Sequence, residues 1–277
     1  MPENPFRNIF IFGDSLSDTG NVYTLSEGLI PISPPFFDGR YSNGQLWTEV
    51  FSGAFGFNAT PSLKGGNNYA YAGARTGVDL NKAGKVIPSL LSQQRQFEQL
   101  HPFGGPSALY LIWGGTNDYY AVDGLSHPTK SDAVKGAGEA VQNLSQLVRK
   151  LIRIRADTIL LLNLPDLGRA PGILHPDLAT AFTAAFNTSL EGEMERLRSG
   201  NTINISVVDI FSLFARVTAN PGSFGLQNVT GQCLDGNDLD GGTPCSQPEQ
   251  YWYWYAVHPT GAGHQIIGQW VLSPTHG

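Results

Sequence analysis

Four short stretches of the sequence contain residues that could perform acyl-transfer chemistry. They are "FGDSLSDTGN" with Ser15, "NYAYAGART" with Gly73, "GGTND" with Asn117 and "VHPTGAGH" with His258. A serine hydroxyl attacks an ester carbonyl when a base takes its proton, and amide donors stabilise the oxyanion that forms. Ser15 is therefore a candidate nucleophile and His258 its candidate base. The candidate oxyanion donors are the amides of Ser15, Gly73 and Asn117.

Each of these residues, taken alone, has an ordinary structural explanation. A serine at a strand-to-helix turn is more typical of a helix N-cap, and the others are typical of a turn glycine, a capping asparagine and a surface histidine. The prediction of a catalytic site therefore depends on the four stretches occurring together in one chain.

The elements that must position these residues alternate along the chain. Apolar runs rich in β-forming residues predict strands within 8–15, 108–118, 158–168 and 203–211. Apolar residues at three- and four-residue spacing predict helices over 131–154 and 179–199. Strands alternating with helices favour an α/β fold with a parallel sheet covered on both faces.

Polar residues that directly follow the predicted strands are candidate functional residues. Parallel sheets bind ligands at the carboxyl ends of their strands. The polar residues at these positions are Asp14, Ser15, Asn117, Asp118 and Asp166. The stretch 19–106 is rich in loop signals, so we expect it to lie over these strand ends.

Composition excludes several classes of protein. The 277 residues are 41% hydrophobic and contain no evident linker or repeat, which predicts a single domain over 1–277. The net charge of -6, with scattered Lys and Arg, argues against nucleic-acid binding. No apolar run is long enough to span a bilayer, so we expect no integral membrane segment. A small molecule or a neutral polymer is the expected partner.

The two cysteines bracket the loop "CLDGNDLDGGTPC" at residues 233–245. Its spacing does not match a zinc site, so we expect a disulfide between Cys233 and Cys245 rather than two free thiols. A disulfide indicates an oxidising compartment and thus a secreted or periplasmic protein. The first residues, "MPENPF", lack a basic segment followed by an apolar one, so a signal peptide was removed or never existed.

The motifs resemble those of the SGNH, or GDSL, hydrolases, a family of serine esterases and lipases. "GDSLSDTGN", "NYAYAGA", "GGTND" and "VHPT" occur in that family's order, and the similarity extends from Ile9 to the last predicted helix. The stretches "GRYSNGQLW" and "NLPDLGR" and the cysteine loop are similar to its bacterial and plant-like branch.

This resemblance implies a flavodoxin-like three-layer α/β/α sandwich that needs no metal and no organic cofactor. It implies that Ser15 is the nucleophile and His258 the base. It also implies an oxyanion hole made by Ser15, Gly73 and Asn117. Asp14 and Asp118 match the motifs as well, and we interpret them as groups that hold the turns.

One position departs from the family pattern. The family has an aspartate three residues before the histidine, in the form W-D-x-V-H-P-T, and here "WYAVHPT" has Tyr255 at that position. A neutral tyrosine cannot supply the charge that stabilises an imidazolium. Three explanations remain open: a Ser–His dyad held by a backbone carbonyl at 252–256, a replacement carboxylate, or an inactive protein that still binds its ligand. The available carboxylates are Asp235, Asp238 and Asp240.

The sequence thus predicts a serine carboxylic ester hydrolase that acts through an acyl-enzyme on short to medium acyl esters, with activity weakened by Tyr255. The non-enzymatic alternative is a catalytically inactive or impaired relative that acts as a ligand-binding module. Among enzymes, the alternatives are a phospholipase, an acyltransferase and a carbohydrate deacetylase. The aromatic stretches "PPFF" and "YWYWY" are either walls of the cleft or parts of the core.

Overall fold

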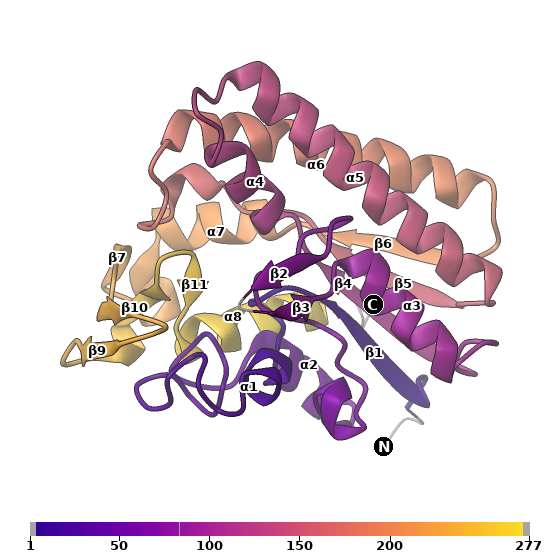
Figure 1. The fold of residues 1–277 in the computed structure, drawn as a ribbon, viewed down its shortest axis with the longest axis horizontal. Coiled ribbons are helices and arrows are strands. Elements are labelled where there is room, and N and C mark those ends of the chain that lie inside the picture. The colour runs from indigo at the N-terminus through magenta and orange to yellow at the C-terminus, as the bar shows by residue number, and fades with distance from the viewer. Residues whose placement is uncertain (1–3, 83, 274–277) are drawn as a thin grey trace.

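The computed structural model describes residues 4–82 and 84–273. Residues 1–3, 83 and 274–277 lie outside the described residues. The segment "MPENPF", on which the signal-peptide prediction rests, is therefore only partly described. A parallel four-stranded sheet forms the centre, in the order β1-β4-β5-β6 (Figure 1). Its strands are β1 (Asn8–Gly13), β4 (Ala108–Trp113), β5 (Thr158–Leu162) and β6 (Asn204–Val208). All four lie within the predicted strand regions.

The central strands are nearly continuous apolar runs because both faces of the sheet are covered. Along β1, Ile9 and Ile11 belong to one core cluster, and Phe10 and Phe12 belong to the cluster on the opposite face. This alternation follows from the two-residue repeat of a strand.

Helices cover the two faces as separate layers (Figure 1). On one side lie α3 (Leu90–Leu100), α4 (Thr116–Asp123), α5 (Lys130–Arg153) and α6 (Pro176–Ser199). On the other side lie α2 (Trp47–Ala54), α7 (Ile210–Ala219) and α8 (Gly261–Leu272). The predicted three-layer α/β/α sandwich is confirmed. The two long predicted helices are α5 and α6, which begin one and three residues earlier than predicted, α5 after the capping box of Thr129 and α6 at Pro176.

An irregular segment lies along the free side of β1. Ile11 donates its backbone N–H to Asn67, and Tyr69 and Tyr71 donate to Ile11 and Gly13 in turn. This segment comes second along the chain and lies outside β1. The arrangement is therefore the 2-1-3-4-5 order of flavodoxin-like sheets, and it leads the chain from residue 71 towards the carboxyl end of β1.

The stretch 19–106 contains more regular structure than its loop signals predict. It includes α1 (Asn21–Leu25), α2, α3 and a short hairpin of β2 (Leu80–Lys82) and β3 (Lys85–Ile87). The strands β2 and β3 were not predicted, because three residues are too few to show the alternating pattern of a strand.

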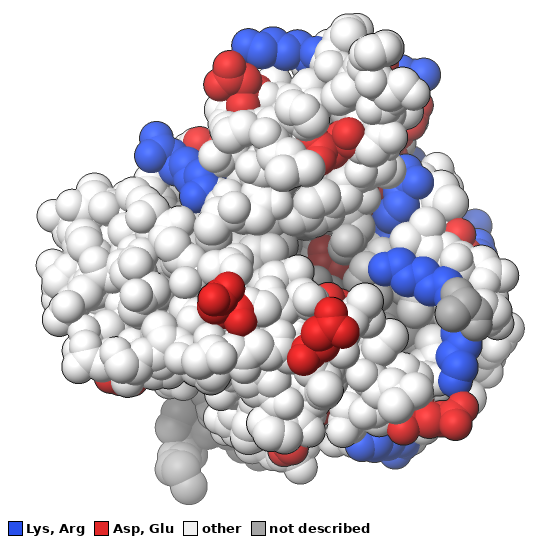
Figure 2. Space-filling view, turned by 60° about the vertical axis from the view of Figure 1, so that its left-hand side comes forward, with Lys and Arg blue, Asp and Glu red and all other residues white. Residues whose placement is uncertain are grey.

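The C-terminal third adds two small sheets and several single turns. β7 (Asn228–Gln232), β10 (Tyr251–Tyr255) and β11 (His258–Pro259) form one sheet, and β8 (Leu234–Asn237) pairs with β9 (Gly241–Pro244). The 3₁₀ turns of this region are η3 (Pro221–Phe224) and η4 (Pro248–Gln250), and two others, η1 (Ser62–Lys64) and η2 (Leu167–Arg169), occur earlier in the described chain. On the face shown in Figure 2, charged side chains are scattered over a largely uncharged surface.

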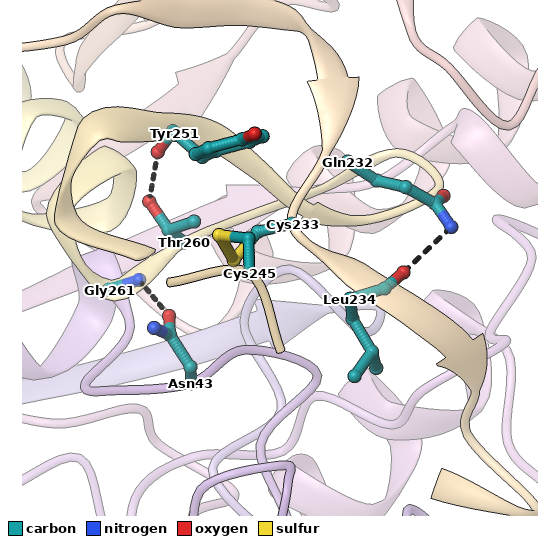
Figure 3. The surroundings of a disulfide bond; sticks show 8 residues. All are labelled: Asn43, Gln232, Cys233, Leu234, Cys245, Tyr251, Thr260 and Gly261. Carbon is teal, nitrogen blue, oxygen red and sulfur yellow. Dashed lines mark hydrogen bonds between the residues drawn. A yellow bond between two sulfur atoms is a disulfide. The ribbon is translucent and has the colours of Figure 1, made fainter. Parts of the chain in front are cut away.

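A disulfide joins Cys233 to Cys245 across this region (Figure 3). The backbone N–H of Cys233 donates to Tyr253 of β10, and Cys245 N–H donates to Cys233 O. Next to the disulfide, the Gln232 side chain donates to Leu234 O and accepts from Ala256 N–H, at 2.9 and 3.0 Å. The disulfide loop therefore supports the strand that leads to His258.

Replacing both cysteines with serine should lower the free energy of unfolding by about 3 kcal/mol, because the crosslink restricts the unfolded chain. For a chain of this length, the melting temperature should fall by roughly 5 °C. Calorimetry of oxidised wild type beside the Cys233→Ser, Cys245→Ser double variant measures both quantities. Equal melting temperatures would show that the crosslink does not stabilise the native state.

Candidate active site

Ser15 lies in a tight turn at the carboxyl end of β1. Asp14 holds this turn, because its carboxylate accepts the N–H of Leu16 at 3.0 Å and its carbonyl accepts the N–H of Ser17. Gly13 must be glycine here, since a Cβ would lie 2.5 Å from the Trp113 carbonyl oxygen. Burial raises the pKa of Asp14 to about 7. Asp14 thus supports the turn, as the sequence predicted.

His258 reaches Ser15 from the other end of the chain. It begins β11, which turns back on β10 through Ala256, a residue with φ 49°. Thr260 caps α8 and donates to Tyr251 O, while Asn43 accepts the N–H of Gly261 (Figure 3). These bonds hold the strand that contains His258, and they place His258 Nε2 2.8 Å from Ser15 Oγ.

The other imidazole nitrogen meets a backbone carbonyl. His258 Nδ1 lies 3.1 Å from Tyr255 O. A carbonyl only accepts hydrogen bonds, so Nδ1 must carry a proton and Nε2 of the neutral ring is free to accept the Ser15 hydroxyl proton. This is the tautomer that a general base requires. Of the three explanations for the missing acid, the geometry matches the first, a carbonyl at 252–256.

The candidate replacement carboxylates do not take that position. In the part of the chain that the structure describes, no carboxylate forms a hydrogen bond with His258 Nδ1. Asp240 accepts from Asn237, and Asp235 pairs with Thr243 in the β8–β9 hairpin. Asp238 lies nearer, on the wall of the same cavity, and its charge raises the pKa of His258 slightly against the effect of burial.

Burial determines the protonation state of His258. The side chain is almost wholly enclosed, and this desolvation lowers its pKa to about 4, despite the opposing effects of the Tyr255 carbonyl and Asp238. Two aromatic rings flank it: Tyr41, with ring centroids 5.2 Å apart, and Tyr255, parallel at 6.2 Å. The imidazole is therefore neutral at pH 7.

The three candidate oxyanion donors belong to residues that line the same cavity. Within residues 4–82 and 84–273, the backbone N–H groups of Ser15 and Gly73 donate to no protein acceptor. Gly73 has φ 81°, a conformation that favours glycine. Asn117, at the start of α4, donates from Nδ2 to Ala74 O at 3.1 Å, which leaves its second amide proton available. Ser15, Gly73, Asn117 and His258 line one cavity.

Two buried aspartates hold the Gly73 loop in place. Asp18 accepts from Ala72 N–H at 2.9 Å on one side of Gly73. Asp118 accepts from both the N–H and the hydroxyl of Thr76, at 3.0 and 2.8 Å, on the other side. Asp118 therefore connects the helix that carries Asn117 to the loop that carries Gly73. The contacts match the interpretation of Asp118 as a structural group.

Replacing Asp118 with asparagine should lower the free energy of unfolding by about 1 to 3 kcal/mol, because one of the two buried donors of Thr76 loses its acceptor. We expect kcat/KM per folded molecule to change by less than tenfold. Denaturant unfolding and ester hydrolysis measure the two effects. A loss of activity above a hundredfold without loss of stability would contradict a purely structural role.

The cavity at this site has a volume of about 610 Å³. Its apolar walls come from aliphatic side chains of α1, the following loop and β3: Val22, Leu25, Leu29, Ile30 and Ile87. The aromatic stretches do not form these walls. Phe36, Trp252, Tyr253 and Trp254 are buried in core clusters instead. The core interpretation is therefore correct for these four residues, whereas Phe37 is exposed and Tyr251 and Tyr255 are only partly buried.

Some residues of the site were not predicted from the sequence, and one predicted candidate lies outside the site. Tyr41, which packs on His258, lies in "GRYSNGQLW", a stretch that resembles the family but to which no site role was assigned. Lys82, which lines the cavity, stands in a stretch without a recognised motif. Asp18 lies inside "GDSLSDTGN", and its place in that motif could have indicated its role. Asp166 accepts from Gly168 and Thr180 and does not line the cavity.

The described ranges 4–82 and 84–273 contain neither a membrane-spanning helix nor a cluster of metal ligands. Among those residues, no helix is both long and apolar enough to cross a membrane. No cluster of three or more His, Cys, Asp or Glu side chains there could hold a metal ion.

A three-layer α/β/α sandwich that brings a serine and a histidine together at the carboxyl edge of its sheet has the architecture of the SGNH class of hydrolases. The chain belongs to the GDSL-like lipase/acylhydrolase family, whose sequence pattern matches residues 9–271. The predicted family and fold are thereby confirmed.

Individual relatives agree with this assignment. The phosphatidylcholine-sterol acyltransferase of Aeromonas hydrophila is 33% identical over 84% of this chain and 67% of its own length. The esterase EstA of Pseudomonas aeruginosa is 27% identical over 98% of this chain, but the match spans only 47% of that protein. An acetylxylan esterase of Geobacillus stearothermophilus, solved as a catalytic mutant, shares the fold at 14% identity and a TM-score of 0.51, over 96% of this chain and 92% of its own.

Proposed function

We propose that this chain is a serine carboxylic ester hydrolase that acts through an acyl-enzyme, with Ser15 and His258 as a catalytic dyad. The observation that carries the proposal is the hydrogen-bonded series from Ser15 Oγ to His258 Nε2, and from Nδ1 to Tyr255 O, at 2.8 and 3.1 Å. Family membership and the esterases among the relatives support the same reaction class.

The reaction proceeds in two halves. His258 Nε2 takes the hydroxyl proton as Ser15 Oγ attacks the ester carbonyl, and the carbonyl oxygen becomes an oxyanion. The amides of Ser15, Gly73 and Asn117 bind this oxyanion. His258 returns the proton to the departing alcohol, which leaves an acyl group on Ser15. Water, deprotonated by His258, then attacks the acyl-enzyme and releases the acid.

We assign short to medium acyl chains to the substrate. The aliphatic walls formed by residues such as Leu25, Ile30 and Ile87 suit an acyl chain, and the cavity volume of about 610 Å³ lies in the range of small-molecule sites. The Tyr255 carbonyl holds the imidazole without the charge of a carboxylate. We therefore infer a slower acylation step than in relatives that retain the aspartate.

Covalent labelling tests the proposal directly. A fluorophosphonate should label wild-type protein at one site, identified as Ser15 by peptide mass spectrometry, and should not label Ser15→Ala. Hydrolysis of p-nitrophenyl acetate and butyrate should accompany labelling and disappear in the variant. Binding of the esters without labelling or hydrolysis would instead favour an inactive, ligand-binding relative.

The disulfide bears on where the protein works. Disulfides such as Cys233–Cys245 persist in oxidising compartments and are rare in the cytosol. We therefore propose a secreted or periplasmic location. Alkylation of free thiols in separate cell fractions, followed by mass spectrometry, would test this location. If Cys233 and Cys245 were alkylated, and therefore reduced, in the fraction that contains the native protein, the proposed location would be wrong.

A further inference from the structure

One basic side chain stands beside the predicted oxyanion hole. Lys82, at the end of β2, lines the same cavity as Ser15 and His258. Its ammonium lies over the Gly73 backbone, so close that a Cβ added to Gly73 would be 3.2 Å from Nζ. A cation in this position faces the space in which the ester carbonyl must sit.

No carboxylate within residues 4–82 and 84–273 pairs with the positive charge of Lys82. Across the described residues, Lys82 forms no ion pair and no side-chain hydrogen bond. Lys85 stands directly opposite it in the β2–β3 hairpin, an unfavourable placement for two like charges. Lys85 is paired, since its Nζ contacts Glu27 Oε1 at 2.9 Å and the Leu25 carbonyl. The unpaired charge at this side of the cavity is therefore that of Lys82.

Few of the side chains that line the cavity are charged. Figure 2 shows a hollow in a sparsely charged face, with basic side chains gathered along one side of it. The other charged residues on the cavity wall are Asp238, Glu27 and Lys85, of which the last two pair with each other. Burial raises the pKa of Tyr41, and the neighbouring Asp238 adds to this effect.

We propose that Lys82 is a specificity-determining residue that binds an anionic group on the alcohol part of the substrate, close to the scissile ester. This inference depends on the proposed esterase function. The aliphatic walls suit the acyl chain, so the charge belongs to the alcohol part. Phosphate and carboxylate groups share the required chemistry, because each accepts hydrogen bonds from an ammonium and carries a negative charge.

Three butyrate esters that differ in one group test the proposal: 1-butyrylglycerol, 1-butyrylglycerol 3-phosphate and 3-butyrylglycerate. At low ionic strength, wild type should show about tenfold higher kcat/KM for an anionic ester than for the neutral one, which corresponds to about 1.4 kcal/mol. Preference for the phosphate alone would identify a phosphate ester as the substrate class. Preference for both anions would identify negative charge as the feature recognised.

Variants locate this preference. Lys82→Met should lower the ratio of kcat/KM for an anionic ester to kcat/KM for 1-butyrylglycerol to about one, and Lys82→Arg should retain the wild-type ratio. Lys64→Met, which removes an exposed lysine outside the cavity, should behave as wild type. The wild-type preference should also weaken as salt rises from about 10 to about 500 mM, because an exposed charge is screened.

Three results would overturn the proposal. Wild type could hydrolyse all three esters equally, or Lys82→Met could keep the preference. Alternatively, Lys82→Met could lower kcat equally for neutral and anionic esters, which would place Lys82 at the oxyanion. If none of the esters were hydrolysed in a Ser15-dependent way, the proposed function itself would fail, and this outcome is distinct from the other three.

Discussion

Replacing Ser15 or His258 with alanine should lower kcat for p-nitrophenyl butyrate by about 10³- to 10⁴-fold, with little change in KM. Ser15 Oγ and His258 Nε2 share one hydrogen bond of 2.8 Å, so removal of either group removes the activated nucleophile. The residual rate comes from the oxyanion donors and the cavity, which both variants retain. Stopped assays at high enzyme concentration measure the low rates.

The double variant provides the sharper measurement. Residues that act as a unit have non-additive effects, so Ser15→Ala, His258→Ala should be no slower than either single variant. Ser223→Ala and His127→Ala, which change exposed residues outside the cavity, serve as matched controls and should retain wild-type rates. Multiplicative losses in the double variant would show that Ser15 and His258 act independently, and would contradict the dyad.

Replacing Tyr255 with aspartate should raise kcat at pH 7 by about 10²-fold. A carboxylate beside Nδ1 stabilises the imidazolium that forms as Ser15 attacks, which the neutral Tyr255 carbonyl does only weakly. Loss of the triad acid costs about 10⁴-fold where the tautomer is also wrong. Here the carbonyl already holds the correct tautomer, so only part of that factor is recoverable. Steady-state hydrolysis of p-nitrophenyl butyrate measures the gain.

The same substitution should move the pH profile. The wild-type pKa of His258 is about 4, so kcat/KM should fall only as the pH drops through about 4 and protonates the base. An added carboxylate favours the protonated ring and raises this pKa, which shifts the acidic limb of Tyr255→Asp to higher pH. Tyr255→Asn removes the ring without adding charge and should change neither quantity by much. An equal gain in the asparagine variant would show that removal of the ring, not the new charge, accelerates the reaction.

The sequence was informative wherever a pattern extended over enough residues. The four apolar strands and helices α5 and α6 repeat their periodicity over five or more residues, and the structure contains all of them. Ser15, Gly73, Asn117 and His258 could be named because each follows a turn in a recognisable motif. The structure brings all four to one cavity.

Other features depend on contacts between distant segments, which no local pattern records. The carbonyl that holds His258 Nδ1 could be assigned only to a range of residues, because any residue has a carbonyl and only the turn at Ala256 decides which one is used. Tyr41 reaches the site from a loop and Lys82 from the short strand β2, and the course of both segments depends on packing. The aromatic stretches were ambiguous because large apolar side chains suit a core and a cleft equally.

The distance along the chain between the two halves of the site has a consequence for how activity first appears. Ser15 and His258 are 243 residues apart, and Ser42 and Asn43 bind the histidine segment across similar separations. A ribosome that adds about 5 to 20 residues per second makes the serine roughly 10 to 50 s before the histidine. During that interval the emerging chain carries a nucleophile without its base. Ester hydrolysis should therefore begin only after synthesis of the C-terminal strands.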